Sequence, residues 1–204
     1  MAFLDTTTPL EPGGYYHIFN RGNNRDDIFY YPGNYPYFLR RYDHYLSNYL
    51  GTYCFCLLSN HFFLLVRIKP EAFVLQHANR RKFNGSASQI VSERFRRFFL
   101  SYSKSINKQT GRTGSLFQKP FRRKKVNEER YFTSLVAYIH YNPERHRVHF
   151  DYTRYPWSSY AAILSDLPTK LMRQELLDWF GGPDRYVDFH RNSVPKGAKH
   201  LMIE

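Results

Sequence analysis

Three side chains of this sequence, a tyrosine, an asparagine and a histidine, are of types that can act together on one substrate. Tyr138 and Asn142 are four residues apart in a stretch, residues 127–142, whose apolar residues recur at helical spacing. Residues at this spacing are neighbours on one helix face, so the phenolic hydroxyl and the amide oxygen point the same way. His61 would join them if its own segment lay beside that face. Taken alone, a tyrosine beside an asparagine on a helix is more often a surface pair, so the pattern needs independent support.

His61 begins the segment "HFFLLVRI", residues 61–68, whose two sets of alternating side chains differ in character. In a strand, one face would hold the apolar residues Phe62, Leu64, Val66 and Ile68. The other face begins with His61 and ends with Arg67. Residues 52–58 read as a preceding strand and Ser59-Asn60 as a tight turn, so the spacing predicts a hairpin over 52–68.

The remaining elements alternate around this hairpin. We expect a strand over residues 15–22, a helix from Asn34 to about residue 50, a basic helix over 86–109 and an edge or interrupted strand over 115–126, which contains Pro120. The helix that begins at Asn127 should end at Asn142, because a residue before proline is disfavoured in the α region. This order predicts an α+β domain, a ferredoxin-like antiparallel sheet with helices packed on one face.

The C-terminal part is expected to form an extension. We predict one domain over residues 1–150 and, over 151–204, a helical extension packed on or tethered to it. A short amphipathic helix is expected around "KLMRQELLDWF", followed by the terminator Gly181-Gly182-Pro183 and a basic tail. Trp157 and Trp179 are most simply core residues of this part.

Charge points to nucleic acid as the partner. The chain carries 30 Lys and Arg against 17 Asp and Glu, a net charge of +13. Between Arg80 and Arg130 there are 15 basic and three acidic residues, a local excess of 15 − 3 = +12, interleaved with aromatics as in "RFRRFF". Cations neutralise phosphates and aromatic rings stack on unpaired bases, so we favour nucleic acid over a merely solvated surface.

Several other classes are disfavoured by the composition. No stretch reaches the roughly 20 apolar residues of a membrane span, and the N-terminus has no export-signal pattern. The two cysteines, Cys54 and Cys56, are two apart on one predicted strand, which makes them poor disulfide partners and fits a reducing cytoplasm. A cysteine-based zinc finger is therefore not available.

The motifs "YYHIFNRGNN", "CFCLLSNHFFLLVRI", "GSLFQKPFRRKKV", "YIHYNPERH" and "YPWSSY" occur in the order and at the approximate spacing of one known family. The sequence resembles the REP-associated tyrosine transposases, the single-tyrosine branch of the HUH single-strand DNA transposases. The resemblance runs from about residue 14 to residue 160, and the region "LLDWFGGPDRYVDFH" is also similar.

The resemblance implies a mechanism and a set of site residues. A helix tyrosine, here Tyr138, attacks a phosphodiester and leaves a 5′-phosphotyrosine and a free 3′-hydroxyl. A divalent metal, Mg²⁺ or Mn²⁺, is held by histidines of a strand, here His61, and by an amide one turn after the tyrosine, here Asn142. The implied partner is single-stranded or hairpin DNA from repetitive palindromic elements, bound by a monomer or a homodimer in the cytoplasm.

One position departs from the family pattern. The resemblance implies a second histidine two residues after His61, and Phe63 stands there instead. The metal site would be impaired, or would recruit another group such as His17 or His140, or would be completed by DNA phosphate and water; the sequence does not separate these. His140, two residues from Tyr138, should point away from its face.

For DNA binding we predict a set of basic residues: Arg21, Arg25, Arg94, Arg96, Arg97, Lys104, Lys119, Arg122, Arg123, Lys124 and Lys125. Within the segment 80–130 they would follow the DNA backbone. The function expected is a DNA-binding, transposase-like protein that nicks and rejoins DNA. The alternative is a non-catalytic DNA-binding regulator derived from such a transposase. An RNA-binding module is weaker, because the aromatic RNP signature is missing from "HFFLLVRI".

Overall fold

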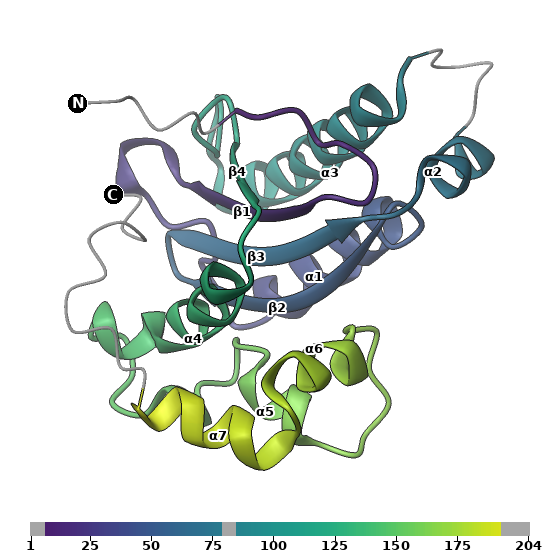
Figure 1. The fold of residues 1–204 in the computed structure, drawn as a ribbon. Helices are drawn as coiled ribbons and strands as arrows, with labels where there is room; N and C mark the ends of the chain where they lie inside the picture. The colour runs from purple at the N-terminus through teal and green to yellow at the C-terminus, as the bar shows by residue number, and fades with distance from the viewer. Residues whose placement is uncertain (1–6, 79–84, 193–204) are drawn as a thin grey trace, which may run out of the picture.

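The structure, a computed structural model, describes residues 7–78 and 85–192. It holds a single sheet and its surrounding helices (Figure 1). In chain order the elements are β1 (Tyr15–Arg21), α1 (Asn34–Leu46), β2 (Leu50–Leu58), β3 (His61–Ile68), α2 (Glu71–His77), α3 (Ala87–Thr110), β4 (Arg122–Val126), α4 (Glu129–Arg145), α5 (Tyr160–Leu164), α6 (Arg173–Phe180) and α7 (Pro183–Asn192). Short 3₁₀ turns lie at Asn23–Arg25 and Tyr152–Arg154.

The four strands form an antiparallel sheet in the order β2-β3-β1-β4. The chain passes β1, α1, the β2–β3 hairpin, α3 and β4, which is the ferredoxin-like arrangement. Ser59 and Asn60 make the hairpin turn. The α+β class, the antiparallel sheet and the hairpin predicted from the sequence are confirmed. The strand predicted over 115–126 is shorter, with β4 beginning after Pro120 at the sheet edge.

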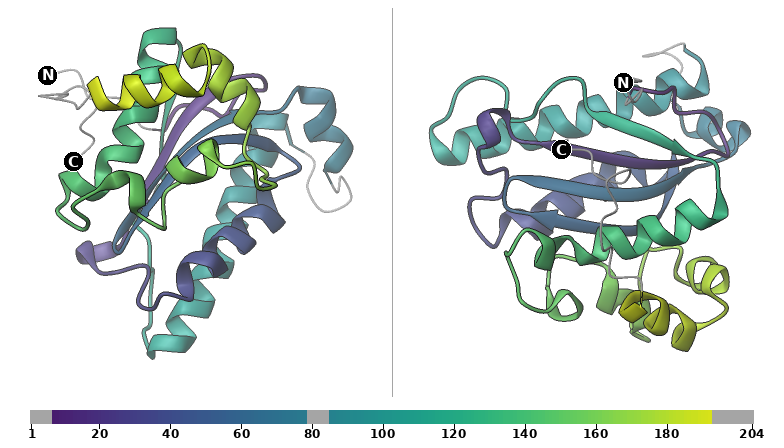
Figure 2. Two further views of the ribbon diagram at one scale, coloured as in Figure 1. Left: turned by 90° about the horizontal axis from the view of Figure 1, so that it is seen from below. Right: turned by 60° about the vertical axis from the view of Figure 1, so that its left-hand side comes forward.

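Helices cover both faces of the sheet, whereas the sequence analysis placed them on one. On the first face α1 and α3 pack against Ile18, Phe62, Leu64 and their neighbours. On the second, α4 and the C-terminal segment pack against Phe19 and Phe63. Figure 2, seen from below, shows the sheet lying between these two layers. The reason is that the side of β3 that begins with His61 carries Phe63 and Leu65 before it ends at Arg67, and these two apolar side chains must also be buried.

Helix α4 continues through Pro143 to Arg145, so its predicted end at Asn142 is wrong. Proline has no N–H, which leaves the carbonyl of Ile139 without its usual helical donor. The side chain of Asn142 contributes instead: its Nδ2 donates to the carbonyl of Tyr138 at 2.8 Å and, at 3.5 Å, to that of Ile139. The extra turn carries Arg145 and, at the C-cap, His146 along the sheet.

The C-terminal segment, residues 151–192, closes the second face and the outer edge of β2. Leu57 N donates to Trp157 O at 2.9 Å and Met172 N to Thr52 O at 2.8 Å. At the far end of the same face, Glu175 of α6 forms an ion pair with Arg67 at 3.4 Å. The first part of the expected basic tail after Gly181-Gly182 forms α7, which begins at Pro183, a residue suited to a first helical position. Residues 193–204 lie outside the described part.

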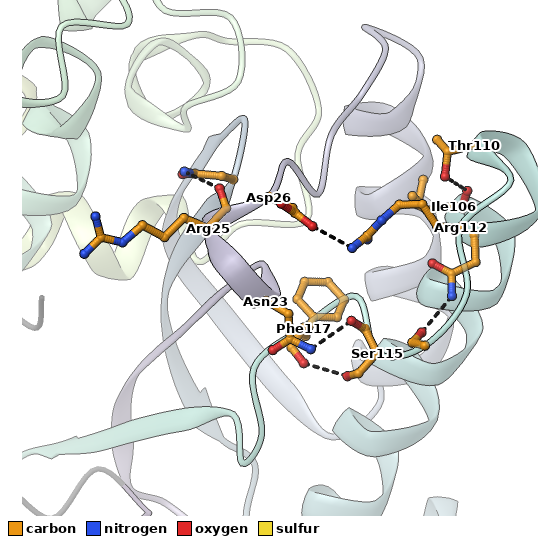
Figure 3. Close-up of polar contacts among 11 residues, drawn as sticks. Asn23, Arg25, Asp26, Ile106, Thr110, Arg112, Ser115 and Phe117 are labelled. Carbon is orange, nitrogen blue, oxygen red and sulfur yellow. Dashed lines mark hydrogen bonds and ion pairs between the residues drawn. The ribbon is translucent and has the colours of Figure 1, made fainter.

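The loop after β1 is held from two sides. Asn23 Nδ2 donates to Ser115 O at 2.8 Å, and Arg112 forms an ion pair with Asp26 at 2.7 Å, which ties the loop to the turn after α3 (Figure 3). From the hairpin turn, Asn60 Nδ2 donates to the carbonyl of Arg25 at 3.2 Å. Figure 3 shows the Arg25 side chain extending away from these contacts.

Both cysteines are buried free thiols, as expected. Within the described ranges 7–78 and 85–192, no helix is long and apolar enough to cross a membrane.

Candidate active site and nucleic-acid interface

Phe63 lies at the centre of the site that the sequence predicts. Its buried ring stacks on His17 with centroids 5.7 Å apart. It meets His61 edge-on at 5.1 Å and Tyr138 edge-on at 5.8 Å. Tyr138 also contacts His17 edge-on, at 6.4 Å. The structure therefore brings the predicted tyrosine and histidine to one side of the sheet, with Phe63 between them.

Tyr138 projects from α4 onto the sheet and is only 2% exposed. Its hydroxyl oxygen accepts a hydrogen bond of 2.7 Å from Arg145 Nη1. The same guanidinium lies over the ring, 5.3 Å from its centroid. The arginine, about two turns further along the helix, reaches back because α4 runs through Pro143. A positive charge at the phenolic oxygen stabilises negative charge that develops there.

His61 is held in the tautomer that a metal ligand requires. Asn60 donates its Nδ2 to Arg25 O, which directs its Oδ1 toward the imidazole. The Nδ1 of His61 lies 2.5 Å from that oxygen, so Nδ1 carries the proton and donates it. The other nitrogen, Nε2, is buried and has no hydrogen-bond partner. A ligating histidine characteristically donates its second nitrogen in this way.

Burial also keeps the ring of His61 neutral. Desolvation, together with the nearby groups His146, Arg21 and Arg145, lowers the pKa of His61 to about 3. The imidazole is therefore uncharged across the physiological range, and its Nε2 lone pair is available.

Asn142 supplies a second unsatisfied donor atom for a cation. Its Nδ2 is occupied by the helix carbonyls of Tyr138 and Ile139. Its Oδ1 is fully buried without a hydrogen-bond partner. Buried polar atoms without partners are uncommon in folded proteins, and a bound cation would satisfy this oxygen. The amide oxygen and the imidazole nitrogen are thus both of a type that can ligate a metal, and both are without a hydrogen-bond partner.

His146 is a residue of the site that the sequence analysis missed. Its ring lies 4.6 Å from that of His61, at an interplanar angle of 68°. A helix that ended at Asn142 would leave His146 in a loop, so no pattern in the sequence placed it beside His61. The spacing of His146, one turn after Asn142, predicts that the two residues share a helix face only if the helix continues through Pro143.

The two substitutes considered for the missing histidine lie elsewhere. His17 is fully buried, with both ring nitrogens unpartnered, and the ring of Phe63 separates it from His61. His140 does point away from Tyr138: its Nδ1 lies 3.0 Å from His190 Nε2 and its Nε2 2.8 Å from Ser159 Oγ. Among the residues described, no group of three or more imidazole, thiol and carboxylate side chains is arranged to hold a metal.

Three of the predicted basic residues lie on the same face of the sheet as Tyr138. Arg21 is paired across the sheet with His61, Arg122 with Phe19, and Lys124 with His17. Beside them, at the start of α4, is an open cavity of about 430 Å³ with Lys124, Arg130 and Tyr131 in its lining. The Nζ of Lys124 lies 4.8 Å from the ring centroid of Tyr131.

Several other predicted basic residues belong to the opposite layer. Four are on α3: Arg94, Arg96, Arg97 and Lys104. Two are on the α3-facing side of β4: Arg123, whose Nε donates to Thr8 O, and Lys125, paired with Glu11.

The predicted segment 80–130 is thus divided between two sides of the sheet, because a helix and an edge strand separate its charges. Arg25 and Lys119 are exposed on loops. Arg80, Arg81 and Lys82, which contribute to the charge of that segment, lie outside the described residues.

An exposed aromatic pair follows the end of α4. Phe150 is 86% exposed, and the ring of His149 stacks on it with centroids 4.8 Å apart and an angle of 15° between planes. The turn that presents them has Arg147 at φ 55°. An exposed ring of this kind is suited to stacking on an unpaired base.

Comparison with known proteins supplies the fold relationship. No protein-family model matches the sequence, and no curated protein matches it. Among solved structures, the chain is similar to a REP-associated tyrosine transposase bound to a REP hairpin, at 13% identity and a TM-score of 0.59. The similarity covers 79% of this chain and 86% of that one. At this identity the comparison establishes the architecture: the chain has the fold of a tyrosine transposase.

Proposed function

We propose that this protein binds single-stranded or hairpin DNA and nicks and rejoins it through Tyr138. The observation that carries the proposal is the grouping of Tyr138, its guanidinium partner Arg145 and the ligand-ready His61 on one face of the sheet. The solved neighbour of the same fold is described as a transposase bound to a REP hairpin, which supports hairpin DNA as the substrate class.

The reaction is an exchange of phosphodiesters. The phenolic oxygen of Tyr138 forms a bond to phosphorus, and the bond from phosphorus to the 3′ oxygen breaks. The phenolic proton passes to water, and the departing 3′ oxygen takes up a proton to become a hydroxyl. Rejoining runs the same exchange backward from a 3′-hydroxyl, so no nucleotide cofactor is needed.

Arg145 prepares the nucleophile. A phenol is almost fully protonated at neutral pH and reacts poorly in that form. The guanidinium at 2.7 Å stabilises the oxygen as the proton leaves. Because Tyr138 is 2% exposed, the scissile phosphate must displace part of this cover, and Arg145 would then transfer its contact from the phenol to the phosphate.

His61 and Asn142 would hold the divalent metal through Nε2 and Oδ1, both of which are buried and lack hydrogen-bond partners. Such a metal supplies Lewis-acid polarisation of the scissile phosphate. Asn60 fixes the imidazole in its ligand tautomer.

The DNA would cross the exposed side of this face. Arg21, Arg122 and Lys124 are placed to neutralise phosphates next to Tyr138. The cavity beside Lys124 continues this basic surface along the start of α4. Phe150 would stack on an unpaired base beyond the other end of α4.

One observation favours a second candidate function, a DNA-binding regulator that does not cut. Phe63 occupies the centre of the site and offers no ligand, so a metal there has one imidazole fewer than the sequence resemblance implies. Such a protein would keep the basic surface and bind hairpins without forming a covalent bond.

A denaturing gel separates the two functions. Wild-type protein is incubated with hairpin oligonucleotides that carry single-stranded flanks, with Mn²⁺ or with EDTA. A covalent protein–DNA band that needs Mn²⁺ and disappears in Tyr138→Phe supports nicking. Tyr141→Phe, in the same helix but packed against Tyr152, is the matched control and should retain the band. Hairpin binding without any band would favour the regulator, and failure to bind hairpins would contradict both.

A further inference from the structure

The departure at Phe63 raises the question of whether another residue of this chain takes the place of the absent histidine. The site contains one imidazole that the sequence pattern does not account for, at the end of α4. We propose that His146 is the second imidazole ligand of a divalent transition-metal site formed with His61 and Asn142. This inference rests on the proposed function for its chemistry, and on the placement of His146 for its evidence.

The separation of the two rings fits a shared ion. Imidazole nitrogens lie about 2.0–2.1 Å from a bound transition metal, so two rings on one ion have centroids about 4.6–5.3 Å apart for bond angles between about 90° and 109°. The rings of His61 and His146 are 4.6 Å apart and inclined at 68°. An edge-on arrangement of this kind is also common where aromatic rings merely pack, so the centroid separation, and not the angle, is the observation that supports a shared ion.

The donor atoms of the three residues have compatible states. His61 donates its Nδ1 proton to Asn60, which leaves Nε2 as the lone-pair nitrogen. Asn142 Nδ2 is engaged with the helix backbone, which leaves the buried Oδ1 without a hydrogen-bond partner and able to act as a ligand atom. His146 is only partly buried, but its Nε2 is shielded from solvent. Asn142 and His146 are four apart on α4 and share a face.

The backbone fixes the new ligand in place. His146 N donates to Asn142 O at 2.9 Å, which keeps it within the helical turn. The following residue, Arg147, takes a left-handed conformation at φ 55°, and His149 N and Val148 N both donate to Pro143 O at 3.1 and 2.9 Å. The turn after His146 is thereby closed, and the imidazole is presented from an ordered position.

The donor set also indicates the kind of metal. Two imidazoles and one amide oxygen favour Mn²⁺ or a later first-row ion such as Co²⁺ over Mg²⁺, which prefers oxygen ligands. The remaining positions would be open to phosphate and water. We therefore expect Co²⁺ and Mn²⁺ to bind the free protein more tightly than Mg²⁺.

The test measures metal binding to the full chain without DNA. Calorimetric titration with Mn²⁺ and Co²⁺ should show one site, weakened at least tenfold in both His146→Ala and His61→Ala. Pulsed electron paramagnetic resonance on bound Mn²⁺ should report two coupled imidazole nitrogens in the wild type and one in His146→Ala. His44→Ala, on the exposed surface of α1, is the control and should bind as the wild type does.

A rescue variant, and a variant of His17 as the alternative imidazole, complete the design. Phe63→His in the His146→Ala background should recover the second imidazole coupling, because it restores a histidine beside His61. An unchanged affinity and coupling in His146→Ala would overturn the proposal, as would loss of coupling in His17→Phe instead. Thermal unfolding without metal checks that each variant is folded.

The outcome is separable from that of the nicking assay. A covalent band with unchanged metal binding in His146→Ala would retain the proposed function and refute this ligand. Metal binding that depends on His146, without any covalent band, would retain the ligand and refute nicking.

Discussion

Replacing Phe63 by histidine should make the stability of this protein depend on metal. Phe63 is 4% exposed and contacts His17, Phe19, His61 and Tyr138. Burial of a phenylalanine side chain contributes about 1.5–3 kcal/mol. An imidazole in the same place forfeits part of this and adds a polar group without a partner, at a cost of about 1–3 kcal/mol. We expect Phe63→His without metal to unfold about 3 kcal/mol more easily than the wild type.

Metal should reverse much of this loss. Alternate residues of a strand point the same way, so the new imidazole would face the same side as His61. If the added ligand tightens binding by tenfold to a hundredfold, the folded state gains about 1.4–2.7 kcal/mol relative to the wild type at saturating Mn²⁺. The deficit of Phe63→His should therefore shrink to about 1 kcal/mol.

The measurement is urea unfolding followed by circular dichroism, in EDTA and in millimolar Mn²⁺. Phe63→Leu is the matched control, since it removes the ring without adding a ligand. It should lose stability equally in both conditions. If Phe63→His and Phe63→Leu respond identically to Mn²⁺, the space around Phe63 is not a metal site and the reasoning fails. Phe63→His should also give more covalent DNA product than the wild type.

Three further predictions concern stability and DNA binding. Burial lowers the pKa of His17 to about 3, with Lys124 adding to the shift, and that of His190 to about 4. As the pH falls, these histidines take up protons in the unfolded chain, where the histidine pKa is near 6.5, before they do so in the folded protein. The free energy of unfolding is therefore highest above pH 6.5 and falls by about 2 kcal/mol per group between pH 7 and pH 5. Urea unfolding at a series of pH values should show this decrease, and His190→Gln should make the decrease smaller. Glu175→Ala leaves the buried hydroxyl of Tyr53 without its acceptor at 2.6 Å and should lower the free energy of unfolding by about 1–3 kcal/mol. Glu175→Gln keeps an acceptor oxygen and should retain most of that free energy. Phe150→Ala should weaken binding of single-stranded DNA by about 1–3 kcal/mol in fluorescence titration and leave duplex binding and stability unchanged; equal loss on both DNAs would contradict a stacking role.

The sheet was predictable because the patterns that indicate its strands and turns lie within short stretches of the sequence. Alternation along residues 61–68 and the turn at Ser59-Asn60 define a hairpin, and the order of elements around it allows few topologies. The number of covered faces was not predictable in the same way. Deciding it required knowing that Phe63 and Leu65 face a second helical layer, which is a property of tertiary packing.

The site was predicted only as far as helix geometry could be read. The spacing of Tyr138 and Asn142 on one helix was correct, and the structure places that helix against the strand of His61. The position of His146 beside His61 was not predicted, because Pro143 suggested that the helix ends at Asn142. In the structure the helix continues, and the side chain of Asn142 donates to the carbonyl of Ile139, which Pro143 leaves without a helical donor. The roles of these residues in catalysis and metal binding stay predictions.

Charge counts located the basic residues in sequence but not in space. Lys124 and Lys125 are adjacent, yet the pleat of β4 sends one toward α4 and the other toward Glu11 on the opposite side. A run of cations on a strand therefore contributes only its alternate members to any one surface.

The seal along the outer edge of β2 also restricts how this protein can self-associate. Thr52, Phe55 and Leu57 already exchange backbone hydrogen bonds with Met172, Ser159 and Trp157 of the same chain. A strand from another molecule could pair with this edge of β2 only after the C-terminal segment had detached from it. Protection against edge-to-edge aggregation is thus built into the segment that follows α4, and truncation before residue 155 should expose the backbone groups of this sheet edge.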